Sequence, residues 1–212
     1  MGFDLYGVNP RINREYPKKY ETIMKEYGTG DGWIDWKKDV PDNVKEEYFD
    51  IKEQYEEDNP GYYFRNNVWW WRPVWEFVCH HCSDFLDDED MARGHSNSGH
   101  EISEGKAIKI GEKLSELLAD GTVDFHDREH RLSYERAKAN NKEVEKELDA
   151  LRKEVKEQCG ENIIPMNYPG EMKEKYEKIY ARRDWDGHYP FHKENIKDFA
   201  VFCLNSGGFE IC

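Results

Sequence analysis

The chain has 212 residues, of which 36% are charged and 14% aromatic, and its formal net charge is −14. A chain of this length can bury one sizeable hydrophobic core, so a single domain is expected. The negative charge repels phosphate backbones and anionic lipid headgroups, which disfavours general nucleic-acid binding and membrane binding.

Two further properties of the sequence concern the cellular compartment. No stretch approaches the roughly 18 apolar residues of a membrane span, and the first residues lack the basic-then-apolar order of a signal peptide. We therefore expect a cytoplasmic protein. The cysteines are odd in number, which indicates reduced thiols rather than a disulfide framework. They are Cys79, Cys82, Cys159, Cys203 and Cys212.

The two ends of the chain show the alternation of apolar and polar residues that is typical of strands. Phe3 to Gly7 alternate in this way, and so do residues 208–212 after a Ser-Gly-Gly turn. Neither strand is long enough to be stable alone. We expect them to pair in one small sheet that packs on helices.

Most of the chain between these strands is predicted to be helical, because apolar side chains recur every three or four residues. The predicted helices lie within 15–27, 42–58, 75–86, 103–118, 127–158 and 171–182, and a last helix follows Phe191. The sequence therefore predicts a mainly α fold of the α+β class, in one domain, 1–212.

One part of this domain is expected to project from the rest. In the long charged helix the apolar residues form a narrow seam of Val144, Leu148, Leu151 and Val155, which suits a single partner helix. The helix at 171–182 is the expected partner, so residues 127–184 are predicted to be a helical-hairpin insertion.

The segment 62–75 is the most informative stretch, because aromatic rings alternate there with arginines and asparagines. Rings offer stacking faces, and guanidinium and amide groups offer planar hydrogen-bond donors for a nucleobase or an anion. In the alternative interpretation, the rings fill the core and the arginines lie over them from outside. The candidate ligand-binding residues of this segment are Tyr63, Arg65, Asn66, Asn67, Trp69, Trp71 and Arg72.

A polar loop at residues 95–101 adds two candidates, Asn97 and His100. The loop precedes a predicted helix, whose N-terminal N–H groups can receive an anion. The alternative is a capping role in which Ser103 or a neighbour satisfies the start of the helix.

Cys79, Cys82, His95 and His100 have the spacing C-x2-C-x12-H-x4-H, which formally fits a zinc finger. The cysteines lie in helical sequence and the histidines in a Ser/Gly loop, whereas a finger needs the reverse. Buried free thiols and no cofactor are the expectation, and a zinc site of other geometry is the open alternative.

Three segments resemble a family of small uncharacterised proteins of tailed bacteriophages and environmental bacteria. They are Met1-Gly2-Phe3-Asp4-Leu5-Tyr6-Gly7, Tyr63-Phe64-Arg65-Asn66-Asn67 with Trp71-Arg72-Pro73, and Ser206-Gly207-Gly208-Phe209-Glu210-Ile211. The charged hairpin is not part of the resemblance. No activity is assigned to the family, so it implies provenance only: a protein of the infected bacterial cytoplasm, among accessory proteins that block or redirect host systems.

These observations lead to one main functional hypothesis and two alternatives. The main one is a non-enzymatic accessory protein, with a role in counter-defence, that captures a small anionic ligand such as a nucleotide or nucleotide-derived signal. The first alternative is an acidic protein–protein inhibitor of a host factor. The second is a metal-dependent hydrolase. No catalytic residue is nominated, because no nucleophile set is apparent from spacing.

Overall fold

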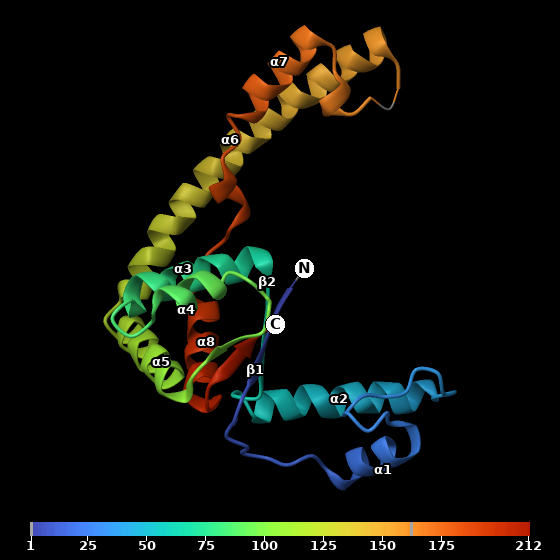
Figure 1. Ribbon diagram of the computed structural model, residues 1–212, viewed down its shortest axis with the longest axis vertical. Helices are drawn as coiled ribbons and strands as arrows, with labels where there is room; N and C mark the ends of the chain where they lie inside the picture. The colour runs from blue at the N-terminus through green and yellow to red at the C-terminus, as the bar shows by residue number, and fades with distance from the viewer. Residues whose placement is uncertain (1, 162) are drawn as a thin grey trace.

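The computed structural model describes residues 2–161 and 163–212, so Met1 of the opening motif lies outside it. One antiparallel sheet with strand order β2-β1-β4-β3 lies at the centre (Figure 1). Its strands are β1 (Gly2–Gly7), β2 (Tyr63–Asn67), β3 (His100–Ile102) and β4 (Phe209–Ile211). The expected pairing of the two chain ends is confirmed, with Leu5 opposite Ile211.

The helices follow the expected periodicity and confirm a mainly α fold with a small sheet. They are α1 (Lys18–Tyr27), α2 (Asp42–Asp58), α3 (Val68–Cys82), α4 (Asp88–Arg93), α5 (Glu104–Ala119), α6 (Thr122–Cys159), α7 (Gly170–Tyr180) and α8 (Lys193–Asn205), with 3-10 turns η1 (Pro165–Asn167) and η2 (Trp185–His188). Within the described residues, none of these helices combines the length and the apolar character needed to cross a membrane.

The segment after α2 differs from the sequence prediction. α3 begins at Val68, not at 75, because Asn67 caps it: its Oδ1 accepts hydrogen bonds from the backbone N–H groups of Trp69 and Trp70. Residues 87–99 were predicted to be a loop. They contain α4, which starts with a capping box between Asp87 and Asp90.

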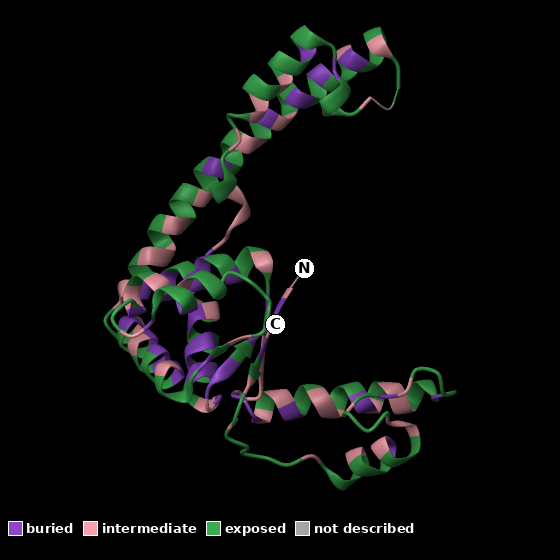
Figure 2. Cartoon of the chain, in the orientation of Figure 1, coloured by how far each residue is buried: buried purple, intermediate pink, exposed green. Residues whose placement is uncertain are grey.

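The main core lies between the inner face of the sheet and helices α3, α5 and α8 (Figure 2). Trp71 and Trp75 are fully buried there, with ring centroids 5.4 Å apart. Both indole N–H groups donate to backbone carbonyls near α4, Trp71 to Gly94 at 2.8 Å and Trp75 to Met91 at 3.1 Å. The two largest rings of the core are therefore also hydrogen-bonded, as buried indoles require.

α6 leaves this body and forms a projecting charged hairpin with α7, as predicted (Figure 1). We call residues 127–184 the arm. The seam residues of α6 are buried against α7 and its loop, and ion pairs such as Arg182 with Glu147 add to the contact. The arm contains 14 acidic and 14 basic side chains, so it is electroneutral. The whole net charge of −14 belongs to the rest of the chain.

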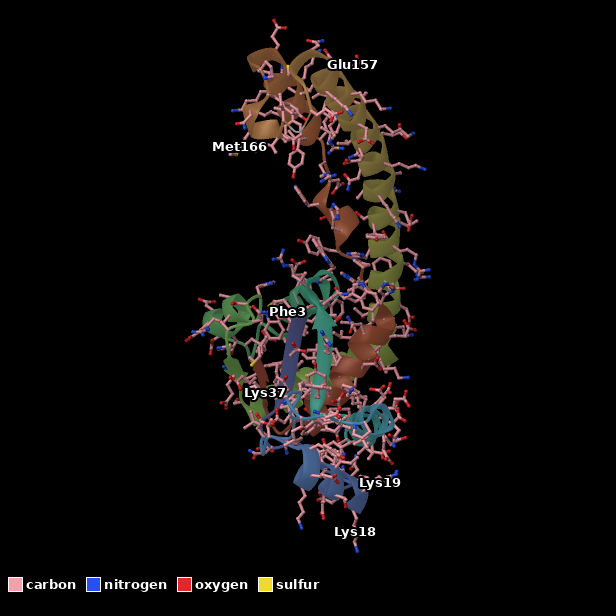
Figure 3. The ribbon with its side chains drawn as sticks, turned by 90° about the vertical axis from the view of Figure 1, so that its right-hand side faces the viewer. Phe3, Lys18, Lys19, Lys37, Glu157 and Met166 are labelled. Carbon is pink, nitrogen blue, oxygen red and sulfur yellow. The ribbon has the colours of Figure 1, made fainter. Side chains whose placement is uncertain are left out.

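α1 and α2 form a second, smaller unit at the opposite end of the molecule from the tip of the arm. In Figure 3 Lys18 and Lys19 of α1 lie at one end, and Glu157 and Met166 of the arm at the other. This unit has its own small core around Ile23, Ile34, Val40 and Tyr48.

A cluster of histidines lies where α6 joins the body. His126 and His130 share one face of α6 and pack on the ring of Phe191, with centroid distances of 4.5 and 5.8 Å. His81 of α3 packs on Phe77 at 4.3 Å, and Phe77 in turn contacts His126. Burial lowers the pKa of His81, His126 and His130 from the ordinary value of 6.5. These three residues form the histidine cluster.

The histidine cluster makes the stability of the protein dependent on pH. Because the pKa values are lower in the folded state, the unfolded chain binds protons first as the pH falls below about 6.5. Folding stability should therefore be lower at pH 5.5 than at pH 7.5 in urea unfolding. The charged and titratable neighbours of the cluster are Glu76, His80, Lys113, Asp120, Asp127, Asp186 and His192.

The matched variant is the double substitution His126→Gln and His130→Gln. It should reduce the loss of stability between pH 7.5 and 5.5, since two of the titrating groups are gone. An unchanged pH dependence in this variant would show that other groups cause it.

Candidate functional site

A groove of about 800 Å³ lies between the outer face of the sheet and the α1–α2 unit. We call it the tyrosine groove, because five of its residues are tyrosines. Its lining comes from β1, the segment before α1, α1, the loop after α1, α2 and β2. The lining residues are Tyr6, Tyr16, Tyr20, Asp31, Gly32, Trp33, Phe49, Lys52, Glu53, Glu56, Tyr62, Tyr63 and Arg65.

The sheet wall of the groove follows from the two-residue period of β1 and β2. Phe3 and Leu5 of β1 point into the core, so Asp4 and Tyr6 point outward. Tyr6 lies opposite Tyr63, with ring centroids 5.2 Å apart, and Asp4 lies opposite Arg65.

Asp4 holds both groove residues of β2. It accepts a hydrogen bond from the Tyr63 hydroxyl, and the Arg65 Nε lies 3.6 Å from its Oδ1. The Arg65 side chain remains 71% exposed, so most of its guanidinium donors face solvent. Burial, with the bond to Asp4, raises the pKa of Tyr63. The Tyr63 hydroxyl therefore remains a protonated donor at neutral pH.

The opposite wall is a stack of tyrosine rings. Tyr16 lies between Tyr20 and Tyr55, with centroid distances of 3.9 and 3.7 Å, and Tyr48 continues the row beyond Tyr20. The hydroxyls of Tyr20 and Tyr48 both donate to the carbonyl of Gly32, at 3.2 and 2.9 Å. These two hydrogen bonds fix the loop after α1, which contains Gly32, to the tyrosine rings.

Asn59 fixes the segment that carries Tyr16. Its side chain is fully buried, and its Oδ1 accepts hydrogen bonds from the backbone N–H groups of Asn13 and Arg14, at 2.7 and 3.0 Å. Its Nδ2 donates to the carbonyls of Arg14 and Tyr55. All four of its hydrogen-bonding positions are used, so the chain entering α1 is tied to the end of α2.

The groove also contains a half-buried cation. The Lys52 Nζ lies 4.0 Å from the ring centroid of Trp33, which is within cation–π distance. Burial lowers the pKa of Lys52 and raises that of Glu56, one helical turn further along α2. Among the described residues no carboxylate lies within 4.0 Å of the Lys52 ammonium. Its charge therefore remains available in the groove.

Of the nine predicted ligand-binding residues, the structure brings only Tyr63 and Arg65 into the groove. Asn66 is buried on the opposite face of β2, and its Nδ2 donates to Asn195 at 2.9 Å. Asn67 caps α3, and Trp71 fills the core. These three side chains have structural partners instead of facing an open site.

Arg72 and Trp69 lie at another place, on the outer side of α3. The Arg72 Nη1 donates to the hydroxyl of Tyr189 at 2.7 Å, and its guanidinium lies over the same ring. Trp69 packs on Tyr189 and His188. The two arginines of the aromatic segment therefore differ in their surroundings: Arg65 lines a groove, whereas Arg72 lies over packed rings.

Asn97 and His100 are far from the groove along the sheet. Asn97 donates to the carbonyl of Gly2 at 3.2 Å. The His100 Nε2 lies 3.0 Å from Asp90, which is buried and also paired with Lys106. Ser103 occupies the N-cap position of α5, although its side chain makes no capping hydrogen bond.

The cysteines and histidines of the formal zinc pattern do not converge. Cys79 and Cys82 lie within α3, where burial raises the pKa of their thiols to about 11 and about 12. Protonated thiols are poor metal ligands and poor nucleophiles. In the part of the chain that the structure describes, no group of three or more His, Cys, Asp or Glu side chains is arranged to hold a metal ion.

Most groove residues lie outside the segment that the sequence singled out. Tyr16, Tyr20 and Lys52 fall within predicted helices, and Trp33 falls between two of them. A signal was present, because aromatic residues are dense on both sides of the Gly28–Gly32 loop. The α1–α2 unit comes to lie beside Tyr63 and Arg65 only through tertiary structure, in which β1 pairs with β2.

No protein-family model matches the chain, and no curated protein or solved structure is similar enough to count as a match.

The network around Asp90 supplies a test of its structural role. Lys106→Met should lower the free energy of unfolding by about 2 kcal/mol, because it removes the cation paired with the buried Asp90 and leaves the His100 ring as the remaining side-chain partner. Urea unfolding at pH 7.5 measures this change. Lys109→Met in the same helix is the control, and an equal effect of both substitutions would refute the assigned role of the network.

Proposed function

We propose that the protein is a non-enzymatic binding protein that captures a small anionic ligand with a planar ring, of the nucleotide class, in the tyrosine groove. The observation that carries this proposal is the presence of stacking rings and two cations, Lys52 and Arg65, in the lining of one groove. The provenance among phage accessory proteins and a role in counter-defence remain part of the proposal, supported by the resemblance of the three segments.

The size and lining of the groove fit such a ligand. Small-molecule sites have volumes of about 300–1,000 Å³ and are lined by aromatic residues with a few polar groups. Trp33 and Tyr6 line the groove and are half exposed, so part of each ring is accessible from it. Base–aromatic stacking contributes about 1–3 kcal/mol for each base.

Two cations of the groove, Lys52 and Arg65, can receive an anionic group of the ligand, although the protein is acidic overall. The Arg65 guanidinium has spare donors, and the Lys52 ammonium is partly desolvated, which strengthens its attraction to an anion. A smaller hollow of about 240 Å³ lies elsewhere on α2. Its charged lining residues are Arg14, Glu15, Glu47, Asp50 and Asp58, and this acidic lining is unsuited to an anion.

The two arginines of the aromatic segment give a matched test. Arg65→Ala should weaken nucleotide binding about tenfold, or about 1.4 kcal/mol, because a charge-assisted contact is lost. Arg72→Ala removes the same charge at Tyr189 and should leave affinity unchanged. Thermal-shift screening of the purified chain with nucleotides and cyclic nucleotides identifies a ligand, and calorimetric titration then compares the variants.

A ligand whose concentration is a hundred times its dissociation constant adds about 2.7 kcal/mol to the free energy of unfolding. Absence of a thermal shift with every nucleotide tested would overturn the proposal. Equal losses of affinity in the two arginine variants would place the ligand outside the groove.

A second candidate function is inhibition of a host protein through the arm. Met166 lies at the tip of the arm (Figure 3). Ile164 and Met166 are 55% and 77% exposed, and they border a hollow of about 350 Å³ with Pro165 and Tyr176. Exposed apolar side chains that lie together are typical of a binding surface. Because the arm is electroneutral, contact would depend on these apolar side chains rather than on the acidic surface.

The double substitution Ile164→Asp and Met166→Asp separates the two candidates. If the tip binds a host protein, affinity purification from a bacterial lysate should lose that partner with the variant, whereas nucleotide binding should stay the same. An identical set of captured proteins for both forms would exclude the tip as the binding surface.

A further inference from the structure

Glu56 is a carboxylate of the tyrosine groove that is half-buried instead of fully solvated. It lies on α2, half-buried in the groove wall, and burial raises its pKa. Among the residues that the structure describes, none donates a hydrogen bond to its oxygens, and no cation lies within 4.0 Å of them. A half-buried acceptor without a protein donor is poised to accept hydrogen bonds from a ligand.

The place of Glu56 relative to the other groove residues restricts the kind of donor. Lys52, which would face an anionic group, precedes Glu56 by one turn of α2, so the two side chains share one face of the helix. The aromatic rings of Tyr6 and Tyr63 line the same groove. A ligand that contacts Lys52, Glu56 and these rings therefore combines an anionic group, hydrogen-bond donors and a ring.

A ribonucleotide has this combination of groups, because its ribose carries hydroxyls and joins the base to the phosphate. Ionised carboxylates are acceptors only, and two oxygens can take two neighbouring hydroxyl donors. A carboxylate that binds a ribose hydroxyl is an established arrangement in dinucleotide-binding folds. Because water also satisfies a carboxylate, the half-buried position of Glu56 in the groove wall matters more than its charge alone.

We infer that Glu56 recognises the ribose hydroxyls of the ligand, so that the groove selects ribonucleotides over deoxyribonucleotides, which rests on the proposed nucleotide-binding function. The charge of the groove also limits the number of phosphates. Three carboxylates, Asp31, Glu53 and Glu56, outnumber the two cations in the lining. One phosphate can be neutralised by Lys52 and Arg65, whereas a triphosphate adds charges that meet no further cation of the groove.

The test uses the purified full chain and nucleoside 5′-monophosphates. Calorimetric titration compares AMP, GMP, CMP and UMP with their 2′-deoxy counterparts. The best-bound ribonucleotide should bind at least tenfold more tightly than its deoxy form. Glu56→Gln should reduce this ratio to about threefold or less, because it removes a carboxylate acceptor of the ribose hydroxyls, whereas the lost charge affects both forms alike.

Glu53→Gln is the matched control, because it removes the same charge from the same helix at an exposed position of the groove. It should leave the ratio unchanged. Equal affinity for the two sugars in the unmodified protein, which needs no variant to fold, would overturn the role of Glu56 while nucleotide capture stands. An unchanged preference of the Glu56→Gln variant for the ribonucleotide over its deoxy form would also overturn the role of Glu56. Absence of binding by every monophosphate would overturn both the inference and the proposed function.

Discussion

Strand β1 is the constraint on which both the core and the groove depend. It is the inner strand that pairs with β2 on one side and with β4 on the other, so it joins the two ends of the chain to the middle. Because its side chains alternate between the two faces, Phe3 and Leu5 enter the core while Asp4 and Tyr6 face the groove. A register shift of one residue would exchange these two sets, so packing of the core also sets the groove wall.

The other wall depends on polar contacts rather than on a large core. The α1–α2 unit has few buried apolar residues, yet its chain path is fixed by the four hydrogen bonds of Asn59 and by the stacked tyrosines. A satisfied buried amide specifies one arrangement, because any other leaves its donors or acceptors unpaired. This explains how a small appended unit can hold Tyr16 and Tyr20 at defined positions beside the sheet.

The sequence predicted the helices and the pairing of the chain ends well, because periodicity is a local signal. It missed β2 and the start of α3, since the aromatic segment was taken as one unit, whereas Asn67 divides it into a strand and a helix. This division determines where the two arginine side chains point. Arg65 follows the two-residue period of a strand and faces the groove, and Arg72 follows the helical period onto Tyr189. The rest of the groove could not be predicted, because its residues meet only through tertiary packing.

The uneven distribution of charge bears on how an acidic protein could attract an anion. The arm is neutral, so the net charge of −14 is carried by the part of the chain that includes the groove. At physiological ionic strength, however, charges are screened over about 8 Å, so distant surface carboxylates contribute little inside the groove. The charged groups that line the groove therefore dominate its electrostatic potential. Among them, Lys52 is partly desolvated over Trp33, so it interacts with an anion in a medium of lower dielectric constant than water. The acidic surface would then slow the approach of anions, while the groove itself could still bind one.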